Sequence, residues 1–435
     1  MSNLNEVRKN STEYAKRYAD FLAASPTSFH AAEEVGKRLS VAHFVQVYAA
    51  DAWPSTPGRY YLKEEGAILA WSIPDEDASS FSVFGAHTDS PGLKLKPVPQ
   101  STTADGWGQL CVEVYGGALY NSWLDRELEV AGAIYDKQGD VHLIRTGPIA
   151  RVPQLAIHLD RGVNDGLKLD PQTSLQPIWT VHNKDADLLE RLAADIGKTK
   201  DQIASTELFC VPTELPGLFG DEGQFLAAGR QDNLSSVYAG LEGFLRAVDQ
   251  DFVHIPVIAF FDHEEVGSSS RTGAAGPLLE TVMRRTAGTL GQDIDRMIAR
   301  SFCISADAGH SVHPNYPHHH DPDARPVAGG GPAAKINANQ RYASTGASLA
   351  RWELLCEAAM VPTQNFVSRN NIPCGSTIGP ITSTRTGLET VDVGIPMISM
   401  HSAREMTHID DVYFLAEAAA VFLSGNALPR TKRQL

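Results

Sequence analysis

The 435-residue sequence has few cysteines, no long hydrophobic run and no cluster of basic residues. Its cysteines occur singly, without a CxxC pair, at Cys111, Cys210, Cys303, Cys356 and Cys374. This pattern favours reduced, mostly buried thiols over a disulfide framework or a thiolate zinc site. The apolar run 255–261 is far shorter than the ~20 residues of a membrane helix. The first ten residues are polar, so we expect no signal peptide and a cytoplasmic protein.

Acidic residues outnumber basic ones. The chain has 37 Lys and Arg against 52 Asp and Glu, a net charge of −15. Without a basic block, this balance argues against nucleic acid and anionic membranes as partners. The composition, 43% hydrophobic and 20% charged, is typical of a folded globular protein. At roughly 150 residues per domain, the length predicts two or three domains.

The pattern of apolar residues changes near residues 92 and 228. Before the first change, the spacing predicts two helices and then two strands, at 12–24, 28–39, 67–71 and 81–86. Residues 93–228 consist mainly of short alternating segments with Gly and Pro breaks, and one helix is expected near 184–196. This middle part predicts a strand-rich insert.

After residue 228 helices and strands alternate again. A helical stripe runs from Leu234 to Val248, and a final helix is expected from Asp410-Asp411 to Leu423, ended by Ser424-Gly425. Strands are predicted between them at 257–261, 302–306 and 397–400. The long loop 314–332 is rich in Pro and Gly, and loops of that length inside a compact domain are usually functional or mobile.

Four of the predicted strands end at side chains that can bind a metal. These are His87, the pair Glu264-Glu265, Asp307 and His401. A fifth such residue, Asp232, lies at the N-cap position of the helix that begins at Leu234. In open α/β sheets, ligands bind beyond the carboxyl ends of the strands. Taken singly, a histidine after a strand or an aspartate before a helix is usually structural. Their recurrence at one structural position predicts a common site.

Ligand type indicates which metal such a site would hold. Two histidines and three carboxylates, without sulfur, suit Zn²⁺, and Co²⁺ or Mn²⁺ are possible substitutes. Asp232 is short and can bridge two ions. His87 and Asp307 would then complete one site, and Glu265 and His401 the other. Two metals ~3.5–4 Å apart can activate water and polarise a carbonyl.

This assignment leaves Glu264 free. A carboxylate beside the activated water can take up its proton and deliver it to a leaving amine. The side chains of consecutive residues in an extended chain point in opposite directions. Glu264 and Glu265 are therefore expected to have different roles in one site.

Ten segments in order along the chain resemble one known family. They are SPTSFHAA (25–32), GAHTDSPGLKLKP (85–97), VYGGALYNSWLDREL (114–128), LAIHLDR (155–161), RQDNL (230–234), DHEEVGS (262–268), SADAGHSVHPNY (305–316), AKINANQRYAS (334–344), PCGSTIGP (373–380) and MHSARE (400–405). The family is that of the aspartyl aminopeptidases, two-zinc metallopeptidases. The resemblance implies an α/β, zinc-aminopeptidase-like catalytic domain with a central mixed β-sheet flanked by helices, formed by residues 1–92 and 229–435. It also implies a strand-rich inserted dimerisation domain, residues 93–228.

The resemblance implies the same two zinc sites and adds further residues. Glu264 would be the general base, and Asp89 would lie behind His87 and orient its imidazole. Lys335, which alone would be taken for a surface lysine, would face the acidic side chain of the substrate's first residue. His158, which alone would be taken for a strand residue with a satisfied side chain, would reach the active site of a neighbouring subunit and stabilise the oxyanion.

Further implications concern the remaining histidines and the assembly. His310 would contact the substrate, and His313 matches a family position near the site. The run His318-His319-His320 is expected to be a loop feature rather than a third metal site. The family assembles as a tetrahedral dodecamer built from dimers, with active sites facing an interior chamber.

We therefore predict a metallo-aminopeptidase that releases N-terminal Asp or Glu from peptides. Three alternatives stay open: an aminopeptidase of broader specificity, a two-metal amidohydrolase or deacylase acting on non-peptide amides, and a non-enzymatic metal-stabilised scaffold. The intact Glu264 disfavours the scaffold, because a protein without catalysis has no need of a base.

Overall fold

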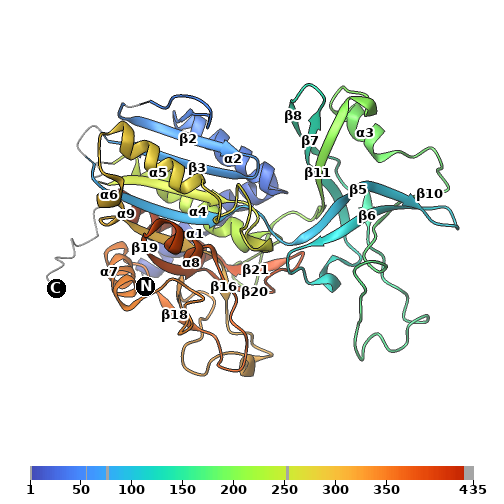
Figure 1. Ribbon diagram of the computed structural model, residues 1–435. Coiled ribbons are helices and arrows are strands. Elements are labelled where there is room, and N and C mark those ends of the chain that lie inside the picture. Colours follow the sequence, from blue (N-terminus) through green and yellow to red (C-terminus); the bar gives the residue numbers. More distant parts are fainter. Residues whose placement is uncertain (1, 55, 75–77, 251–253, 426–435) are drawn as a thin grey trace.

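The computed structural model describes residues 2–54, 56–74, 78–250 and 254–425. Figure 1 shows two lobes, with the amino-terminal end and the final helix in the larger one. None of the helices in these ranges is both long and apolar enough to cross a membrane.

A nine-stranded sheet forms the centre of the larger lobe. In spatial order its strands are β1 (Val45–Gln46), β2 (Gly58–Glu64), β3 (Ala67–Ile73), β14 (Ile255–Phe261), β4 (Phe81–His87), β15 (Phe302–Ala306), β19 (Glu389–Gly394), β17 (Ala333–Ile336) and β18 (Gln364–Val367). The neighbours β14, β4, β15 and β19 are parallel, whereas β3 and β17 run antiparallel to them. Every residue of β3, β4 and β14 is buried, as expected for strands covered on both faces.

Helices cover both faces of this sheet. One face packs against α1 (Ser2–Ala24), α2 (Ser28–Val41), α4 (Gln231–Ala247), α7 (Gly346–Ala359) and α9 (Ile409–Ser424). The other packs against α5 (Leu278–Thr289), α6 (Ile294–Ile298) and α8 (Ile378–Thr386). Because side chains alternate along a strand, Phe84 of β4 joins the first core and Val83 joins the second.

The helices predicted for this lobe are all present, with shifted boundaries. The first is longer than expected, because α1 begins at Ser2 instead of residue 12. The last helix begins at Ile409, and its N-cap is His408, whose side chain accepts a hydrogen bond from the backbone N–H of Asp410. It ends at Ser424, and its C-cap Gly425 has a φ of 73°, which glycine adopts easily. The loop 314–332 contains one short 3₁₀ turn, η4 (Pro317–His319).

The smaller lobe is built on a seven-stranded sheet. Its strands, in spatial order, are β11 (Ile203–Pro212), β5 (Gly92–Thr102), β6 (Trp107–Tyr115), β10 (Ile178–Val181), β9 (Ala150–Arg151), β7 (Glu127–Asp136) and β8 (Val141–Arg145). Because β11 pairs with both β5 and β7, the sheet closes on itself. Burial alternates along β6, and α3 (Leu188–Asp195) contributes Leu188 and Leu192 to the core of this lobe.

A third, five-stranded sheet joins segments that are far apart in sequence. It runs β12 (Gly217–Phe219), β13 (Phe225–Ala228), β21 (Glu405–His408), β20 (Pro396–Ile398) and β16 (Gly309–His310). The strands β12 and β13 belong to the range 93–228, yet β13 pairs with β21 near the end of the chain.

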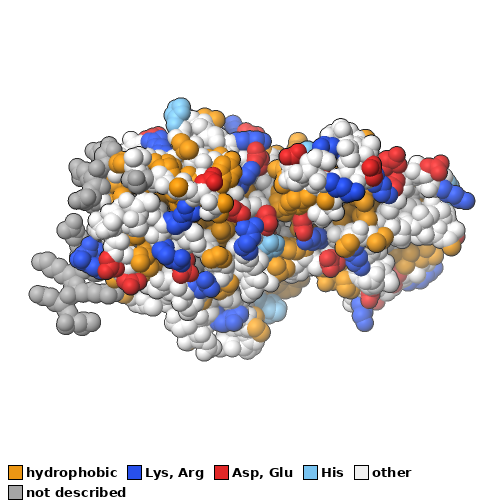
Figure 2. All heavy atoms as spheres, turned by 45° about the horizontal axis from the view of Figure 1, so that its top comes forward, with side chains coloured by type: hydrophobic (Ala, Val, Ile, Leu, Met, Phe, Trp, Pro, Cys, Tyr) orange, Lys and Arg blue, Asp and Glu red, His pale blue; other side chains and the backbone are white. Residues whose placement is uncertain are grey.

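A cavity of about 300 Å³ lies where the two lobes meet. Its walls include Phe29 and Arg230 from the larger lobe and Tyr135 and Phe209 from the smaller one. Figure 2 shows hydrophobic side chains gathered at this junction.

Candidate metal centre

Five residues with metal-binding side chains meet near the junction of the lobes. His87 is the last residue of β4, Asp307 directly follows β15, and Glu265 lies in the 3₁₀ turn η3 (Glu264–Val266) after β14. Asp232 and the next residue have non-helical backbone angles inside the first turn of α4, so the regular helix begins at Leu234. His401 follows β20 and has a φ of 67°. Strand ends and one helix start therefore position the five side chains.

Two local expectations from the sequence are wrong. The strand before His401 belongs to the five-stranded sheet, so the residues do not all follow strands of one sheet. Glu264 and Glu265 lie in a 3₁₀ turn instead of an extended segment, because the chain reverses there through His263 and Gly267, both in the left-handed conformation.

One group of possible ligands surrounds the Nε2 atom of His87. It lies 3.4 Å from Oδ1 of Asp232 and 3.5 Å from Oδ1 of Asp307. All three side chains are buried. Oε2 of Glu264 is also near, at 3.9 Å.

A second group surrounds the Nε2 atom of His401. It lies 3.3 Å from Oδ2 of Asp232 and 3.4 Å from Oε2 of Glu265. Asp232 therefore faces one histidine with each of its carboxylate oxygens. In both groups the nitrogen and oxygen atoms all lie within 4.8 Å of one another, as the ligands of one ion do.

The hydrogen-bonding state of these atoms fits a metal. The Nε2 of His87, Oδ1 of Asp232 and Oε1 of Glu265 are buried without a hydrogen-bond partner among the described residues. Burying such an atom costs free energy unless a hydrogen-bond donor or a metal ion binds it. The opposite ring nitrogens are used: Nδ1 of His87 lies 3.0 Å from the backbone oxygen of Asp89, and Nδ1 of His401 lies 3.1 Å from that of Gly117. Such bonds leave Nε2 as the ligand atom in metal sites.

The electrostatics of the site also favour a bound cation. Burial raises the pKa of Glu264 to about 8, and repulsion from Asp307 and Asp232 adds to this against the effect of His87. Burial raises the pKa of Glu265 as well. Burial opposes protonation of His87, but hydrogen bonds to Asp232 and Asp307 outweigh it and raise the pKa of the imidazole. The carboxylates thus compete for protons, and a divalent cation would relieve this crowding.

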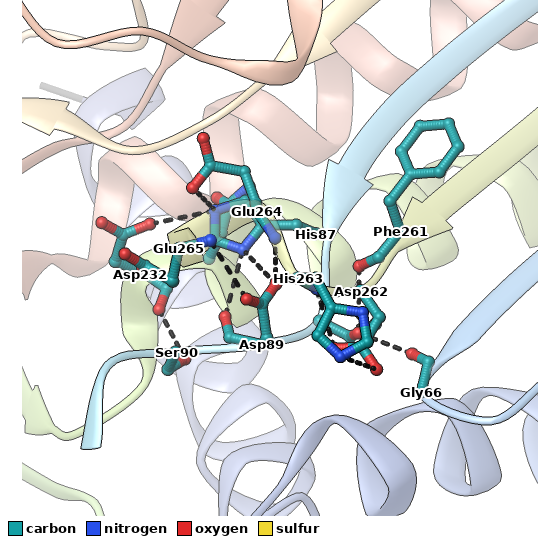
Figure 3. A network of polar contacts seen from close by, with 12 residues as sticks. Gly66, His87, Asp89, Ser90, Asp232, Phe261, Asp262, His263, Glu264 and Glu265 are labelled. Atoms are coloured by element: carbon teal, nitrogen blue, oxygen red, sulfur yellow. Dashed lines mark hydrogen bonds and ion pairs between the residues drawn. The ribbon is translucent and has the colours of Figure 1, made fainter. Parts of the chain in front are cut away.

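Asp89 lies directly behind the centre. Its Oδ1 and Oδ2 accept the backbone N–H groups of Glu264 and Glu265 at 3.0 and 3.1 Å, as Figure 3 shows. Its Oδ1 is also 3.3 Å from Nδ1 of His87. The sequence anticipates only the contact with His87. The structure adds that Asp89 holds the backbone of the paired glutamates.

Two further residues support the centre and were not singled out from the sequence. Tyr115, at the end of β6, donates its hydroxyl to Oδ2 of Asp89 at 2.7 Å, which connects the smaller lobe to the site. The carboxylate of Glu405 accepts the backbone N–H groups of His401 and Asp232. Both residues lie within motifs that carry the family resemblance, which was the available signal.

Lys335 and His310 lie beside the centre. Lys335 is buried, and its Nζ donates to the backbone oxygen of Ala308 at 2.7 Å and lies 3.5 Å from Oδ2 of Asp307. It is therefore not the surface lysine that its residue type alone suggests. His310 is exposed, and its ring centroid lies 6.1 Å from that of Phe366.

His158 lies in an exposed turn of the smaller lobe, so the expectation of a satisfied strand residue is wrong. The neighbouring Leu155, Ile157 and Leu159 are also exposed. The run His318–His320 begins in η4, and the ring centroids of His318 and His319 lie 4.5 Å apart, with the rings tilted by 42°, in the loop 314–332.

Comparison with known proteins places the chain in a family. A family model described as Aminopeptidase I zinc metalloprotease (M18) matches residues 21–423. A probable M18 family aminopeptidase 2 from Streptomyces avermitilis is 48% identical over 416 residues, which cover 93% of this chain and 96% of the relative. A chain in the cryo-EM structure of the Ape4 and Nbr1 complex is 31% identical with a TM-score of 0.91, covering 96% of this chain and 86% of that one. The structure of the S. cerevisiae mApe1 dodecamer is 26% identical with a TM-score of 0.84, covering 95% and 97%.

These similarities confirm the predicted mixed α/β fold and the metallo-aminopeptidase class. The chain belongs to the M18 family of aminopeptidase I zinc metalloproteases, and it is a hydrolase.

Proposed function

We propose that this aminopeptidase removes N-terminal Asp and Glu from peptides at a centre of two zinc ions. The observation that carries the proposal is that Asp232 lies between two groups of ligand atoms, each with a histidine and a second carboxylate. His87, Asp232 and Asp307 would hold one ion. Asp232, Glu265 and His401 would hold the other. A pair of zinc ions, when bound, supplies a Lewis acid for the scissile carbonyl and lowers the pKa of water.

Glu264 is the proposed general base and acid. Its carboxylate reaches the same space as Nε2 of His87, and neither proposed ion needs it as a ligand. Its backbone is held by Asp89, so the side chain is positioned without occupying its carboxylate. Glu264 accepts the proton of the attacking water and delivers it to the departing amine. Asp89 orients His87 through the 3.3 Å contact.

Lys335 is the proposed determinant of acidic specificity. It is a buried cation at the edge of a site dominated by carboxylates. An ammonium group beside the carboxylate of Asp307 can pair with the Asp or Glu side chain of a substrate and so favour acidic residues. The exposed His310 lies on the strand just beyond Asp307 and is proposed to contact the substrate.

His158 is proposed to act in a neighbouring subunit of a homo-oligomer. It is exposed among Leu155, Ile157 and Leu159, and a cluster of exposed apolar side chains commonly marks an interface. The mApe1 structure is a dodecamer. We propose a tetrahedral dodecamer for this chain, built from dimers through residues 93–228, with residues 1–92 and 229–435 as the catalytic domain. Its five free cysteines support a cytoplasmic location.

Hydrolysis of Asp-, Glu-, Leu- and Ala-anilides, with chelator and with zinc added back, tests the proposed specificity. We expect Asp and Glu substrates to react fastest and only with metal. Equal rates for all four would indicate a broader aminopeptidase. Strict preference for N-acylated compounds over free amines would indicate a deacylase and contradict the proposal.

Mixing two inactive variants tests the role of His158. Oligomers that contain both His158→Ala and Glu264→Gln subunits would regain activity, because some sites would combine an intact Glu264 with an intact His158 from a neighbour. If only the unmixed wild type is active, His158 does not act between subunits.

A further inference from the structure

Glu405 joins two parts of the metal centre that are distant in sequence. It is the first residue of β21 and is 1% exposed. Its Oε1 accepts the backbone N–H of His401 at 2.8 Å, and its Oε2 accepts the backbone N–H of Asp232 at 3.1 Å. One buried carboxylate therefore spans the chain segments that carry two of the proposed ligands.

Neither of these N–H groups belongs to a regular helix or strand. Asp232 has φ −81° and ψ 102°, and His401 has a φ of 67°. Segments of this kind are not positioned by a repeating hydrogen-bond pattern, so a side chain must satisfy their N–H groups and define their position. A charged acceptor makes a stronger hydrogen bond to a backbone N–H than a neutral one does.

Glu405 is itself rigidly placed. It lies opposite Ala228 in the pairing of β21 with β13, while β20 pairs with the other side of β21. Its backbone oxygen accepts a hydrogen bond from Nε2 of Gln231 at 3.0 Å, and Oε1 of Gln231 accepts the hydroxyl of Thr407 at 2.6 Å. The strand therefore fixes Glu405, and Glu405 can transmit this position to the ligands.

We propose that Glu405 is a positioning residue that sets the zinc affinity of the subsite formed by Asp232, Glu265 and His401. This inference rests on the two-zinc centre proposed above. Glu405 contacts two of the three ligand residues of this subsite but only Asp232 in the subsite of His87 and Asp307. Loss of the Glu405 carboxylate should therefore lower the affinity for one zinc ion more than for the other.

Zinc titration of the metal-free protein tests this without relying on activity. The wild type, Glu405→Gln and Glu405→Asp would be titrated with Zn²⁺ in competition with a chromophoric chelator. The amide of Gln keeps one acceptor but directs an N–H₂ group at a backbone N–H, and Asp is too short to span both groups. We expect one of the two zinc equivalents to lose about 10–100-fold in affinity with Gln, the usual effect of removing a partner that orients metal ligands, while the other changes less; the loss with Asp should be smaller.

Glu129→Gln is the matched control. Glu129 is a buried glutamate of β7 that pairs with Arg145 in the smaller lobe. Its substitution should lower stability and leave both zinc affinities unchanged. The increase in unfolding temperature on adding zinc gives a second measure, because it depends on affinity for the folded state. That increase should be reduced by Glu405→Gln and retained by Glu129→Gln.

The outcomes separate the inference from the proposed function. A wild type that binds one zinc ion per chain would overturn the two-zinc centre, whatever the variants do. If the wild type binds two ions and Glu405→Gln binds both with unchanged affinity, the positioning role of Glu405 is wrong. An equal loss at both subsites would show general structural damage and would also overturn it.

Discussion

The buried carboxylates of the two lobes are compensated in different ways. In the smaller lobe, Glu129 pairs with Arg145 at 2.7 Å, and Asp136 pairs with Lys198 at 2.8 Å. At the metal centre, Oδ1 of Asp232 and Oε1 of Glu265 have no hydrogen-bond partner among the described residues. In the smaller lobe, Arg and Lys side chains neutralise the buried carboxylates. At the centre, carboxylate oxygens that could bind a metal have no partner among the described residues.

This difference distinguishes a structural cluster from a metal site of similar composition. Asp136, Asp140 and His142 also have ligand atoms within 4.8 Å of one another. However, Asp136 already contacts Lys198 and lies 3.0 Å from Nε2 of His142, and it accepts the backbone N–H of Asp140. An ion would have to displace a lysine there. Proximity of ligand types is therefore less informative than whether the protein has already satisfied them.

Metal removal should have the largest effect on the larger lobe. We expect chelation to abolish hydrolysis and to lower the unfolding temperature, because the carboxylates around Asp232 lose the charge that offsets their repulsion. Zinc should restore both, and Co²⁺ or Mn²⁺ should be tested as substitutes. The measurements are anilide hydrolysis and thermal unfolding with and without chelator. Full activity in the thoroughly chelated protein would contradict a metal-dependent reaction.

Glu264→Gln tests whether this carboxylate is a base or a ligand. We expect kcat to fall by about 10²–10⁴-fold, the usual contribution of a general acid–base group, with the zinc content unchanged. Steady-state kinetics and metal analysis of the same sample measure both quantities. Glu417→Gln, at a surface ion pair with Arg246, should leave both unchanged. Loss of a zinc ion from the Glu264 variant would make it a ligand instead.

Lys335→Met tests the lysine that lies 3.5 Å from Asp307, one of the proposed ligands. The ratio of kcat/KM for Asp- and Leu-anilides should fall by about 10–100-fold, because a hydrogen bond between charged groups contributes about 1.5–3 kcal/mol. The ratio is the appropriate measure, since Lys335 also lies 3.5 Å from Asp307 and its loss can slow both reactions. An unchanged ratio would exclude Lys335 as the source of acidic specificity.

Glu129→Gln tests the ion-paired carboxylates of the smaller lobe. Removing the acid leaves Arg145 without its partner, and we expect the free energy of unfolding to fall by about 1–3 kcal/mol. Activity at saturating substrate should not change, because the described contacts of this pair join β7 to β8 and to Ala23 and include no proposed ligand. Chemical denaturation and kcat measure the two effects. A large fall in kcat without loss of stability would show that the pair has a different role.

The pH dependence of stability should depend on His30, where α2 meets the smaller lobe. Burial, followed by repulsion from Arg145, lowers the pKa of His30 to about 4 from its usual 6.5. The unfolded chain therefore binds a proton between these values that the folded chain does not, and stability is lost as pH falls from about 6.5 to about 4. With His30→Gln the unfolding temperature should fall less steeply over this window. Identical slopes would show that His30 does not contribute.

Much of the architecture follows from local sequence patterns. Apolar periodicity locates the helices α2 and α9 and the buried strands β4, β14 and β15. Burial of one or both faces of an element requires apolar residues at a regular spacing. The ligand types at His87, Asp232 and Asp307 could be read in the same way, since they stand at the ends of these elements.

Other features could not be read locally. Apolar periodicity does not predict the start of α1 at Ser2 or the 3₁₀ turn at Glu264 and Glu265. The burial of Lys335 and the exposure of His158 were contrary to what their residue types and neighbours suggest. For Lys335 the environment is supplied by a distant part of the chain, Asp307 and Ala308, to which periodicity is insensitive.

The sequence by itself determined the α/β class, the chemistry of the available ligands and, through ten motifs, the resemblance to a metallo-aminopeptidase family. Only the tertiary structure decided which atoms are left unsatisfied, and that one carboxylate, Glu405, holds the backbone of both Asp232 and His401. The physical reason is that residue type and spacing are local properties. Burial, hydrogen-bond satisfaction and charge compensation depend on which distant segments pack together.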